Sequence, residues 1–229
     1  MKLSVIIPVY NECDTIELIL KRVEAAPYEK EIILVDDASI DGTGEILQRL
    51  SRHNQDQIRL FVHPRNRGKG AAIRTAIPSV TGDIVIIQDA DLEYDPQDYP
   101  RLLQPILEGH ADVVFGNRFH GGTHRVLYFW HSLGNRLLTT LCNIVTNLNL
   151  SDMEVGYKVF RAEVLQHLCL MSDRFGIEPE LTVKVAKLNC RIYEVPIAYH
   201  GRTYAEGKKI GWKDGIAAIY YILRFRLFD

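Results

Sequence analysis

Two aspartates separated by a single residue, Asp89 and Asp91, are the side chains whose type and spacing most directly suggest chemistry in this sequence. Carboxylates two positions apart on an extended chain project to the same side. Together they can offer oxygen ligands to one Mg²⁺ or Mn²⁺ ion, with a substrate phosphate and water completing the shell. Ala90, between them, leaves room for a ligand to approach the backbone. Two solvated turn residues are the plain alternative, which this spacing alone does not exclude.

Other enzyme classes that use similar residues fit less well. Phosphatases of the haloacid dehalogenase type carry D-x-D-x-[TV] after a strand, with the first Asp as nucleophile, whereas this chain has Glu93 at the fifth position. No G-x-G-x-x-G follows the first predicted strand, as a dinucleotide-dependent oxidoreductase would require. The run from Asn66 to Gly70 lacks the Walker spacing and is typical of a turn into a helix. In a functional interpretation, that helix N-terminus would bring Lys69 near a diphosphate.

The elements that must position these residues alternate through the first half of the chain. Short apolar runs predict strands, and amphipathic stretches between them predict helices. The predicted strands cover residues 3–9, 31–36, 58–62, 84–88 and 112–115, and the predicted helices cover residues 14–26, 41–53, 68–80 and 97–108. Most of these strands are apolar on both faces, as in a parallel sheet covered by helices on each side. The fold class is therefore α/β, with a doubly wound, Rossmann-like, mostly parallel sheet.

Ligands of such sheets bind beyond the carboxyl ends of the strands. The residues that follow the predicted strands are polar or acidic at several of these ends. They include Tyr10 and Glu12 after the first strand, Asp36 and Asp37 after the second, the acidic pair after the fourth, and Arg118 after the fifth. A binding site is therefore expected at this edge.

The second half of the chain has a different pattern. Apolar residues recur at steps of three and four between residues 126 and 148, which predicts a long amphipathic helix. Short strands are expected around residues 157–160 and 192–197, with a helix over 178–188 and a terminal apolar-aromatic helix over 211–228. We expect a domain over 1–210, made of two halves at 1–118 and 119–210 and followed by a C-terminal amphipathic helix at 211–229.

Composition excludes several classes of protein. The formal net charge of −2 gives no basis for bulk nucleic-acid binding. Four scattered cysteines without C-x-x-C spacing favour thiols in a reducing cytoplasm. No segment reaches the ~20 apolar residues that span a bilayer, so we expect a cytoplasmic protein whose membrane contact is peripheral or made through a partner. A homo-oligomer is compatible with this composition.

Taken together, the motifs resemble inverting family-2 glycosyltransferases of GT-A fold. The segments that carry this resemblance are Ser4–Glu12, Val35–Thr43, Asn66–Ala71, Gly82–Asp83 and Asp89–Glu93. Within the family, the second half is similar to dolichol- and polyprenyl-phosphate mannose synthases and their bacterial relatives. Its matching segments are Gly116–Phe119, Asp152–Arg161, Phe175–Glu180, Glu194–Ile197 and Gly201–Arg202.

This resemblance makes 1–118 the nucleotide-sugar-binding half and 119–210 the acceptor half, and it implies a role for each matching residue. Pro8, Tyr10, Glu12, Asp36 and Asp37 would line the nucleoside pocket, with Lys69, Asp89 and Ala90 completing the nucleotide-sugar site. Asp89 and Asp91 would bind the metal, joined by Glu93 where relatives often carry Gln. Asp91, Arg118 and Arg202 would carry the reaction. Ala38 departs from the family pattern, because it replaces the usual glycine of the D-D-G-S turn.

The chemistry of the acceptor decides whether a base is needed. A hydroxyl must lose a proton to a nearby carboxylate, and Asp152 and Glu154 are the candidate bases, although both are also typical of turns. A lipid phosphate, with a second pKa near ~6, is already mostly a dianion and needs only cations. Arg118 and Arg202, with Lys158 as a weaker third, suit that task because guanidinium groups bind phosphate bidentately.

The predicted function is transfer of a hexose from GDP-mannose or UDP-glucose to a polyprenyl phosphate, such as a dolichyl or undecaprenyl phosphate. The long amphipathic helix and the terminal helix would supply an apolar surface, or would pack on the core or a partner. Basic residues near the terminus would meet anionic headgroups: Lys208, Lys209, Lys213, Arg224 and Arg226. The alternatives are a transferase acting on a hydroxyl of a polysaccharide or glycolipid, a metal-dependent phosphatase, and a non-catalytic nucleotide-sugar-binding module.

Overall fold

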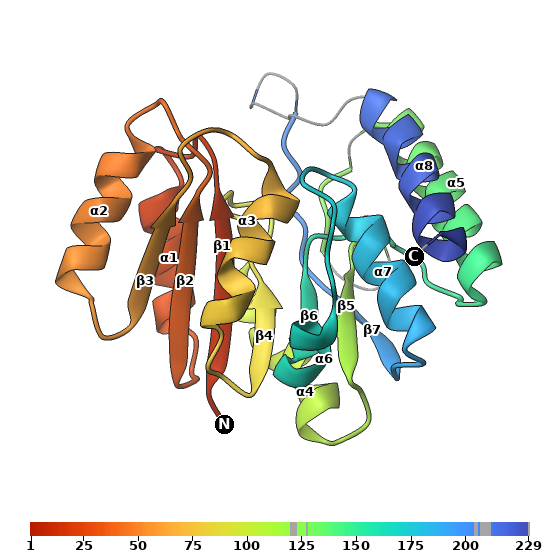
Figure 1. Cartoon of the computed structure of the whole chain (residues 1–229), viewed down its shortest axis with the longest axis horizontal. Helices are drawn as coiled ribbons and strands as arrows, with labels where there is room; N and C mark the ends of the chain where they lie inside the picture. The colour runs from red at the N-terminus through yellow and green to blue at the C-terminus, as the bar shows by residue number, and fades with distance from the viewer. Residues whose placement is uncertain (120–122, 127, 204–205, 207–211, 229) are drawn as a thin grey trace.

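A seven-stranded sheet forms the centre of the molecule, shown in Figure 1. The computed structural model describes residues 1–119, 123–126, 128–203, 206 and 212–228. The strands are β1 (Leu3–Val9), β2 (Lys30–Asp36), β3 (Ile58–Val62), β4 (Ile84–Ile87), β5 (Val113–Asn117), β6 (Lys158–Arg161) and β7 (Ile192–Pro196). Their order across the sheet is β3-β2-β1-β4-β6-β5-β7. Neighbouring strands are parallel except at β6, which runs antiparallel to both β4 and β5.

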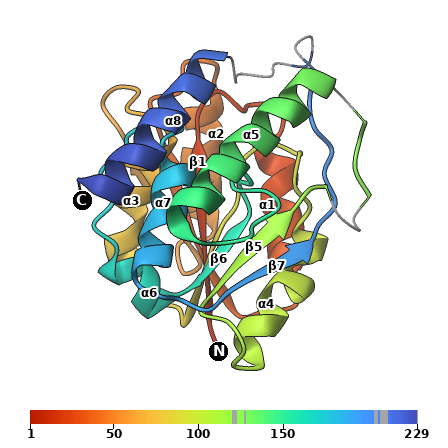
Figure 2. The same cartoon turned by 90° about the vertical axis from the view of Figure 1, so that its right-hand side faces the viewer.

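Helices cover both faces of this sheet, as the two views in Figures 1 and 2 show. Their bounds are α1 (Ile16–Ala25), α2 (Thr43–His53), α3 (Lys69–Ala76), α4 (Tyr99–Leu107), α5 (Phe129–Thr146), α6 (Ala162–His167), α7 (Ile177–Lys187) and α8 (Trp212–Leu227). Helices α1 and α3 lie on opposite faces of the sheet. Burial on both sides explains why β1, β2 and β4 are apolar with little alternation. The predicted α/β class is confirmed.

Differences from the predicted elements have local causes. The helix expected over 68–80 ends as α3 at Ala76 and continues as the 3₁₀ turn Ile77–Ser79, because Pro78 has no backbone N–H to extend the α-helical ladder. A second 3₁₀ turn, Pro96–Asp98, precedes α4 where one helix was expected. Helix α6, only six residues long, was not predicted.

The strand expected around residues 157–160 is present as β6, but its antiparallel direction was not predicted. The chain reaches it from the carboxyl edge of the sheet, where Gly156 lies against Asp89 just beyond β4. A strand that enters at that edge must run against its parallel neighbours. Its insertion between β4 and β5 places Asp152 and Glu154, the residues just before it, at the ligand-binding edge.

Helices α5, α7 and α8 form a separate small layer beside the sheet (Figures 1 and 2). Cys142, Met153, Val183, Ile222 and Phe225 make its buried core. The apolar residues expected to form one stripe on α5 are divided, because Leu141 packs against this core whereas Trp130, Leu137 and Ile144 are 76%, 63% and 73% exposed.

Two findings concern the whole described chain. All four cysteines are free thiols, of which Cys142 is buried and Cys169 is exposed. Among the helices that the structure describes, none is both long enough and apolar enough to cross a bilayer. Lys208 and Lys209 lie outside the described residues, as does the side chain of Lys213.

Candidate active site

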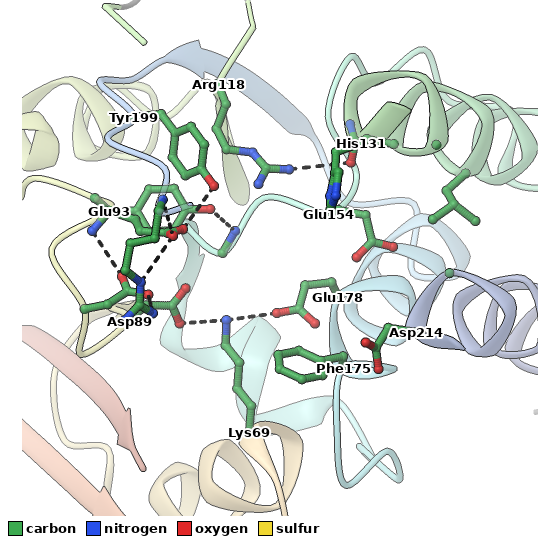
Figure 3. Close-up of a pocket in the computed structure, with 18 of the residues that line it drawn as sticks. Lys69, Asp89, Glu93, Arg118, His131, Glu154, Phe175, Glu178, Tyr199 and Asp214 are labelled. Carbon is green, nitrogen blue, oxygen red and sulfur yellow. Dashed lines mark hydrogen bonds and ion pairs between the residues drawn. The ribbon is translucent and has the colours of Figure 1, made fainter. Parts of the chain in front are cut away.

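A cavity of about 1260 Å³ opens between the carboxyl edge of the sheet and the helical layer. Figure 3 shows side chains from both sides converging on it. Most residues predicted to form the site line this cavity: Pro8, Tyr10, Glu12, Asp37, Lys69, Asp89, Ala90, Asp91, Glu93, Arg118, Glu154 and Arg202. Its other wall is apolar and comes from α5 and α8, through Phe129, Trp130, Leu137, Leu138, Ile216 and Ile219. The structure therefore joins the predicted polar site to an apolar groove.

The acidic pair lies at the polar end of the cavity. Asp89 Oδ1 pairs with Lys69 Nζ at 2.7 Å, and Asp91 Oδ2 accepts a hydrogen bond from Arg202 Nη2 at 2.6 Å. Burial, together with the charges of Asp89 and Glu93, raises the pKa of Asp91 to about 7, although Arg202 opposes this shift. Three carboxylates are thus held close enough to repel one another, which favours binding of a cation.

Gly156 allows Asp89 to sit where it does. A Cβ added at this glycine would lie 2.4 Å from Asp89 Oδ2 and 3.0 Å from the ring of Tyr94. The backbone N–H of Gly156 also donates to Tyr94 Oη at 2.9 Å. Any larger side chain would have to displace the aspartate.

Lys69 begins helix α3 and is held by a network around Asp37. Asp37 Oδ2 accepts from the Gly68 N–H at 2.6 Å, and its Oδ1 accepts from the Arg67 N–H at 2.8 Å. His63 Nδ1 lies 2.6 Å from the same Oδ1. Asp37 therefore fixes the turn that delivers Lys69, in addition to lining the predicted nucleoside pocket.

Two of the three predicted metal ligands fit a hard cation. Asp89 and Asp91 are adjacent oxygen donors at the cavity surface, the ligand type that Mg²⁺ and Mn²⁺ prefer. Glu93 is engaged elsewhere, because its carboxylate accepts from Tyr199 Oη at 3.0 Å and from the Arg202 N–H at 2.9 Å. Within the described residues, no group of three or more His, Cys, Asp and Glu side chains could hold a metal ion. The pair would thus need donor phosphate oxygens to complete a site.

Arg118 follows strand β5 and is clamped by Asp152. Its Nε and Nη2 donate to the two carboxylate oxygens of Asp152 at 2.6 and 2.7 Å. Burial opposes the charged form, but Asp152 outweighs it and raises the pKa of Arg118 above its usual value. The guanidinium carbon lies 5.1 Å from the ring centre of Tyr199 and 5.4 Å from that of Phe119. This is a fixed cation at the cavity wall.

Arg202 is the second predicted phosphate-binding arginine, and it faces carboxylates. Its Nη atoms bond Asp91, and also Glu12 at 3.3 Å, while its Nε lies 3.4 Å from Glu93. Its side chain is 24% exposed. Arg202 is thus held by three carboxylates at the polar end of the cavity.

Three predicted site residues do not line the cavity. Asp36 is 3% exposed and accepts from the Ser39 N–H, so it shapes the turn after β2. Lys158 is 1% exposed, and its ammonium donates to the carbonyls of Met153 and Val155, which corrects its predicted contact with the acceptor. Asp152 is fully buried against Arg118, so its predicted role as a base is also corrected.

Glu154, the other candidate base, does line the cavity. Burial and the charge of Glu178 raise its pKa to about 8, against the opposing effect of Lys158 and Arg118. A carboxyl group with this pKa is mostly protonated at neutral pH and cannot serve there as an efficient base.

Sequence reasoning missed several cavity residues. Glu178, in the first turn of α7, pairs with Lys69 Nζ at 2.9 Å. Its segment was recognised as a family motif, but no role was assigned to it. Tyr94, Tyr199 and Phe175 also line the cavity, and no pattern in the sequence distinguishes them from core aromatics.

The fold matches solved glycosyltransferase structures. Glucosyl-3-phosphoglycerate synthase from Mycobacterium tuberculosis, in complex with Mn²⁺, uridine diphosphate and phosphoglyceric acid, superposes with a TM-score of 0.72 at 20% identity, over 100% of this chain and 79% of that one. A structure of the same synthase with Mg²⁺ and uridine diphosphate gives a TM-score of 0.72 at 21% identity, over 99% of this chain and 78% of that one. The fold is therefore GT-A.

Sequence comparison then identifies the family. Residues 4–169 match Glycosyl transferase family 2, and an undecaprenyl-phosphate mannosyltransferase from Micrococcus luteus is 31% identical over 96% of this chain and 92% of its own length. This chain belongs to glycosyl transferase family 2 and is a glycosyltransferase. An undecaprenyl-phosphate 4-deoxy-4-formamido-L-arabinose transferase from Edwardsiella ictaluri is 32% identical over 90% of this chain, which spans 62% of that relative's length.

Proposed function

We propose that this protein transfers a hexose from a nucleotide-diphosphate donor, GDP-mannose or UDP-glucose, to a polyprenyl phosphate. One observation carries the proposal. The same cavity joins the Asp89–Asp91 edge to the apolar walls of α5 and α8, and it has Arg118 and Arg202 in its polar part. A donor diphosphate suits the acidic edge with its metal, a prenyl chain suits the apolar groove, and the acceptor phosphate suits the arginines between them.

The state of the candidate bases favours a phosphate acceptor over a hydroxyl. Asp152 is bound by Arg118 and shielded from the cavity, and the raised pKa of Glu154 leaves it mostly protonated. A phosphate monoester needs no base, because it is already largely a dianion at neutral pH. Attack from the face opposite the diphosphate would invert the anomeric centre.

The names of the relatives support this acceptor class. Both the Micrococcus luteus and the Edwardsiella ictaluri proteins are named as undecaprenyl-phosphate transferases, although for different sugars. These two names share an acceptor but differ in the sugar. This is consistent with a phosphate-binding site that the relatives have in common and a donor-sugar site that varies among them.

In this proposal, different side chains would bind the metal, the diphosphate and the acceptor phosphate. Asp89 and Asp91 would hold Mg²⁺ or Mn²⁺, which would offset the negative charge that develops on the departing diphosphate. Lys69 would add a second positive charge beside it, at the N-terminus of α3. Arg118, fixed by Asp152, would orient the acceptor phosphate for attack.

We also propose that the outer faces of α5 and α8 contact the membrane surface where a lipid acceptor resides. On α8, Tyr220 and Leu227 are 58% and 66% exposed, beside Arg224 and Arg226. Such exposed apolar side chains next to basic ones suit an interface with anionic headgroups.

A radiolabelled donor assay tests the proposed reaction. Purified protein is incubated with Mn²⁺ or Mg²⁺, undecaprenyl phosphate, and UDP-[¹⁴C]glucose or GDP-[¹⁴C]mannose. Label that passes into an organic-extractable product only when lipid is present supports the proposal. Label that moves only to a water-soluble hydroxyl acceptor, or is released as free sugar, or stays on the donor, contradicts it.

A further inference from the structure

Glu178 presents an unsatisfied carboxylate oxygen to the cavity. The residue is 6% exposed, and its Oε1 bonds Lys69 Nζ at 2.9 Å. Its Oε2 is buried and has no hydrogen-bond partner among the residues that the structure describes. Burying a charged acceptor without a partner is costly, so such a group in a binding cavity indicates a donor supplied by a ligand.

Glu154 repeats this feature from another part of the chain. It lies before β6, lines the same cavity, and has a buried Oε1 without a hydrogen-bond partner among the described residues. The nearby ammonium of Lys158 is directed to two backbone carbonyls. In Figure 3 the carboxyl groups of Glu154 and Glu178 both point into the open space between the acidic edge and the helical layer.

The place of this pair relative to the diphosphate follows from Lys69. One ammonium bonds Asp89 Oδ1 at 2.7 Å and Glu178 Oε1 at 2.9 Å, so Glu178 lies two hydrogen-bond lengths from the acidic edge. A group attached to a diphosphate at Asp89 would extend into the space beside Glu178 and Glu154. The ring of Phe175 lies alongside and adds an apolar surface (Figure 3).

We propose that Glu178 and Glu154 bind the hydroxyl groups of the donor sugar and thereby set which sugar the enzyme accepts. A sugar hydroxyl can both donate and accept a hydrogen bond, so it suits the buried, unpartnered oxygen of Glu178 and that of Glu154 in either protonation state. A site built to hydrogen-bond a hydroxyl discriminates strongly against an analogue that lacks it. The inference rests on the proposed nucleotide-sugar donor, and it is independent of the acceptor.

Isothermal titration calorimetry distinguishes binding of the donor sugar by these glutamates from a purely structural role. Glu178→Ala and Glu154→Ala are titrated with UDP and UDP-glucose, and with GDP and GDP-mannose, in the presence of Mn²⁺. We expect each variant to lose about tenfold in affinity for the sugar nucleotide that the wild type binds better. Affinity for the matching nucleoside diphosphate should stay within about twofold. The exposed Glu163 on α6 provides the control variant Glu163→Gln.

A second measurement covers the case in which a variant folds poorly. The wild type is titrated with donor analogues that lack one hydroxyl at the 2, 3, 4 or 6 position. We expect at least one analogue to bind about tenfold more weakly, and the same analogue to bind Glu178→Gln or Glu154→Gln no worse than the parent sugar nucleotide does.

Two outcomes overturn the inference. Equal losses for UDP and UDP-glucose would show that Glu178 acts only through Lys69 on the diphosphate. Unchanged affinity for every deoxy analogue in the wild type would show that no hydroxyl is bound. Neither result depends on transfer to undecaprenyl phosphate. A wrong acceptor assignment would therefore leave these binding results unchanged and can be told apart from a failure of this inference.

Discussion

Asp89, Asp91 and Glu93 crowd together at the polar end of the cavity, an arrangement that suits the proposed binding of a cation and a diphosphate. Asp91 is the clearest case, with its pKa raised to about 7 by burial and by its acidic neighbours. Such groups lower the stability of the folded protein in exchange for function.

Asp91→Asn is expected to abolish metal-dependent transfer without unfolding the protein. The amide keeps the shape but loses the charge that would bind Mg²⁺ or Mn²⁺, so activity should fall by at least about 100-fold. Because the change relieves repulsion from Asp89 and Glu93, the melting temperature should stay the same or rise. Steady-state assays and calorimetry measure both quantities, and full activity in the variant would refute the metal assignment.

Arg118→Lys is expected to impair use of the acceptor. Lysine keeps the charge but cannot reproduce the two-point contact with Asp152 at 2.6 and 2.7 Å, nor a bidentate contact with phosphate. We expect kcat/KM for undecaprenyl phosphate to drop about 100-fold, equal to about 2.7 kcal/mol. Donor binding, measured by calorimetry, should be unchanged. The exposed Arg52→Lys on α2 serves as control, and equal losses in both variants would contradict the assignment.

Ala38 adopts the left-handed conformation that its side chain disfavours. Its φ is 62°, in the turn where family members usually carry glycine. This conformation costs a non-glycine residue about 1–2 kcal/mol. Glycine avoids that cost, but it loses more conformational entropy on folding, which offsets part of the gain. Ala38→Gly should therefore raise the free energy of unfolding by about 0.5–1 kcal/mol. Urea denaturation measures this, and a destabilised variant would show that the turn is not strained.

At the scale of elements, α5 and α8 have two faces with different tasks. Leu138 and Leu141 on α5 pack with Ile222 and Phe225 of α8 in the small core. The opposite sides expose apolar residues and border the cavity. A helix pair that was only needed for packing would carry polar residues on that side.

Replacing Trp130 and Ile144 together with serine tests the proposed contact between α5 and the membrane surface. Both side chains are more than two thirds exposed, so the melting temperature should change little. Binding to vesicles of phosphatidylcholine with about one third phosphatidylglycerol should weaken at least tenfold, because each buried side chain contributes about 1.5–3 kcal/mol. Ile40→Ser, at an 85% exposed residue in the turn after β2, is the matched control. Vesicle sedimentation that does not distinguish the two variants would refute the role.

At the scale of the whole molecule, Glu31 ties several strands together far from the cavity. It is 3% exposed on β2 and accepts hydrogen bonds from Ser4 Oγ of β1 and from the Thr81 N–H and Oγ1 before β4. Burial opposes its charged form, but these hydrogen bonds outweigh burial and lower the pKa of Glu31 to about 2. The ionised carboxylate is therefore part of the folded structure.

This shift predicts an acid-labile fold. Because the folded pKa of Glu31 lies below its ordinary value of 4.5, its stabilisation is fully present above pH 4.5 and is lost as the pH falls toward about 2. Glu31→Gln should be less stable than the wild type at neutral pH. It should also lose less stability across this pH range, and parallel pH profiles of the two proteins in urea denaturation would contradict the prediction.

Much of the fold follows from local patterns. The apolar runs predicted β1 to β5 within one or two residues at most ends, because strands buried on both faces must be apolar throughout. The order of acidic residues after successive strands likewise predicted one shared edge, which the cavity confirms for Asp37, Asp89 and Asp91. The direction of β6 was not predictable, since it depends on where the chain returns after α5 rather than on any local pattern.

The sequence by itself determined the residue types at the sheet edge, the resemblance to family-2 glycosyltransferases, and the oxygen-rich character of the site. Only the tertiary structure decided which of those residues share the cavity. It buried Lys158 and Asp152 and left Glu154 and Glu178 facing open space. Residue type limits the chemistry that a side chain can perform. Burial and neighbouring charges, which long-range packing sets, decide its protonation state and whether a ligand can reach it.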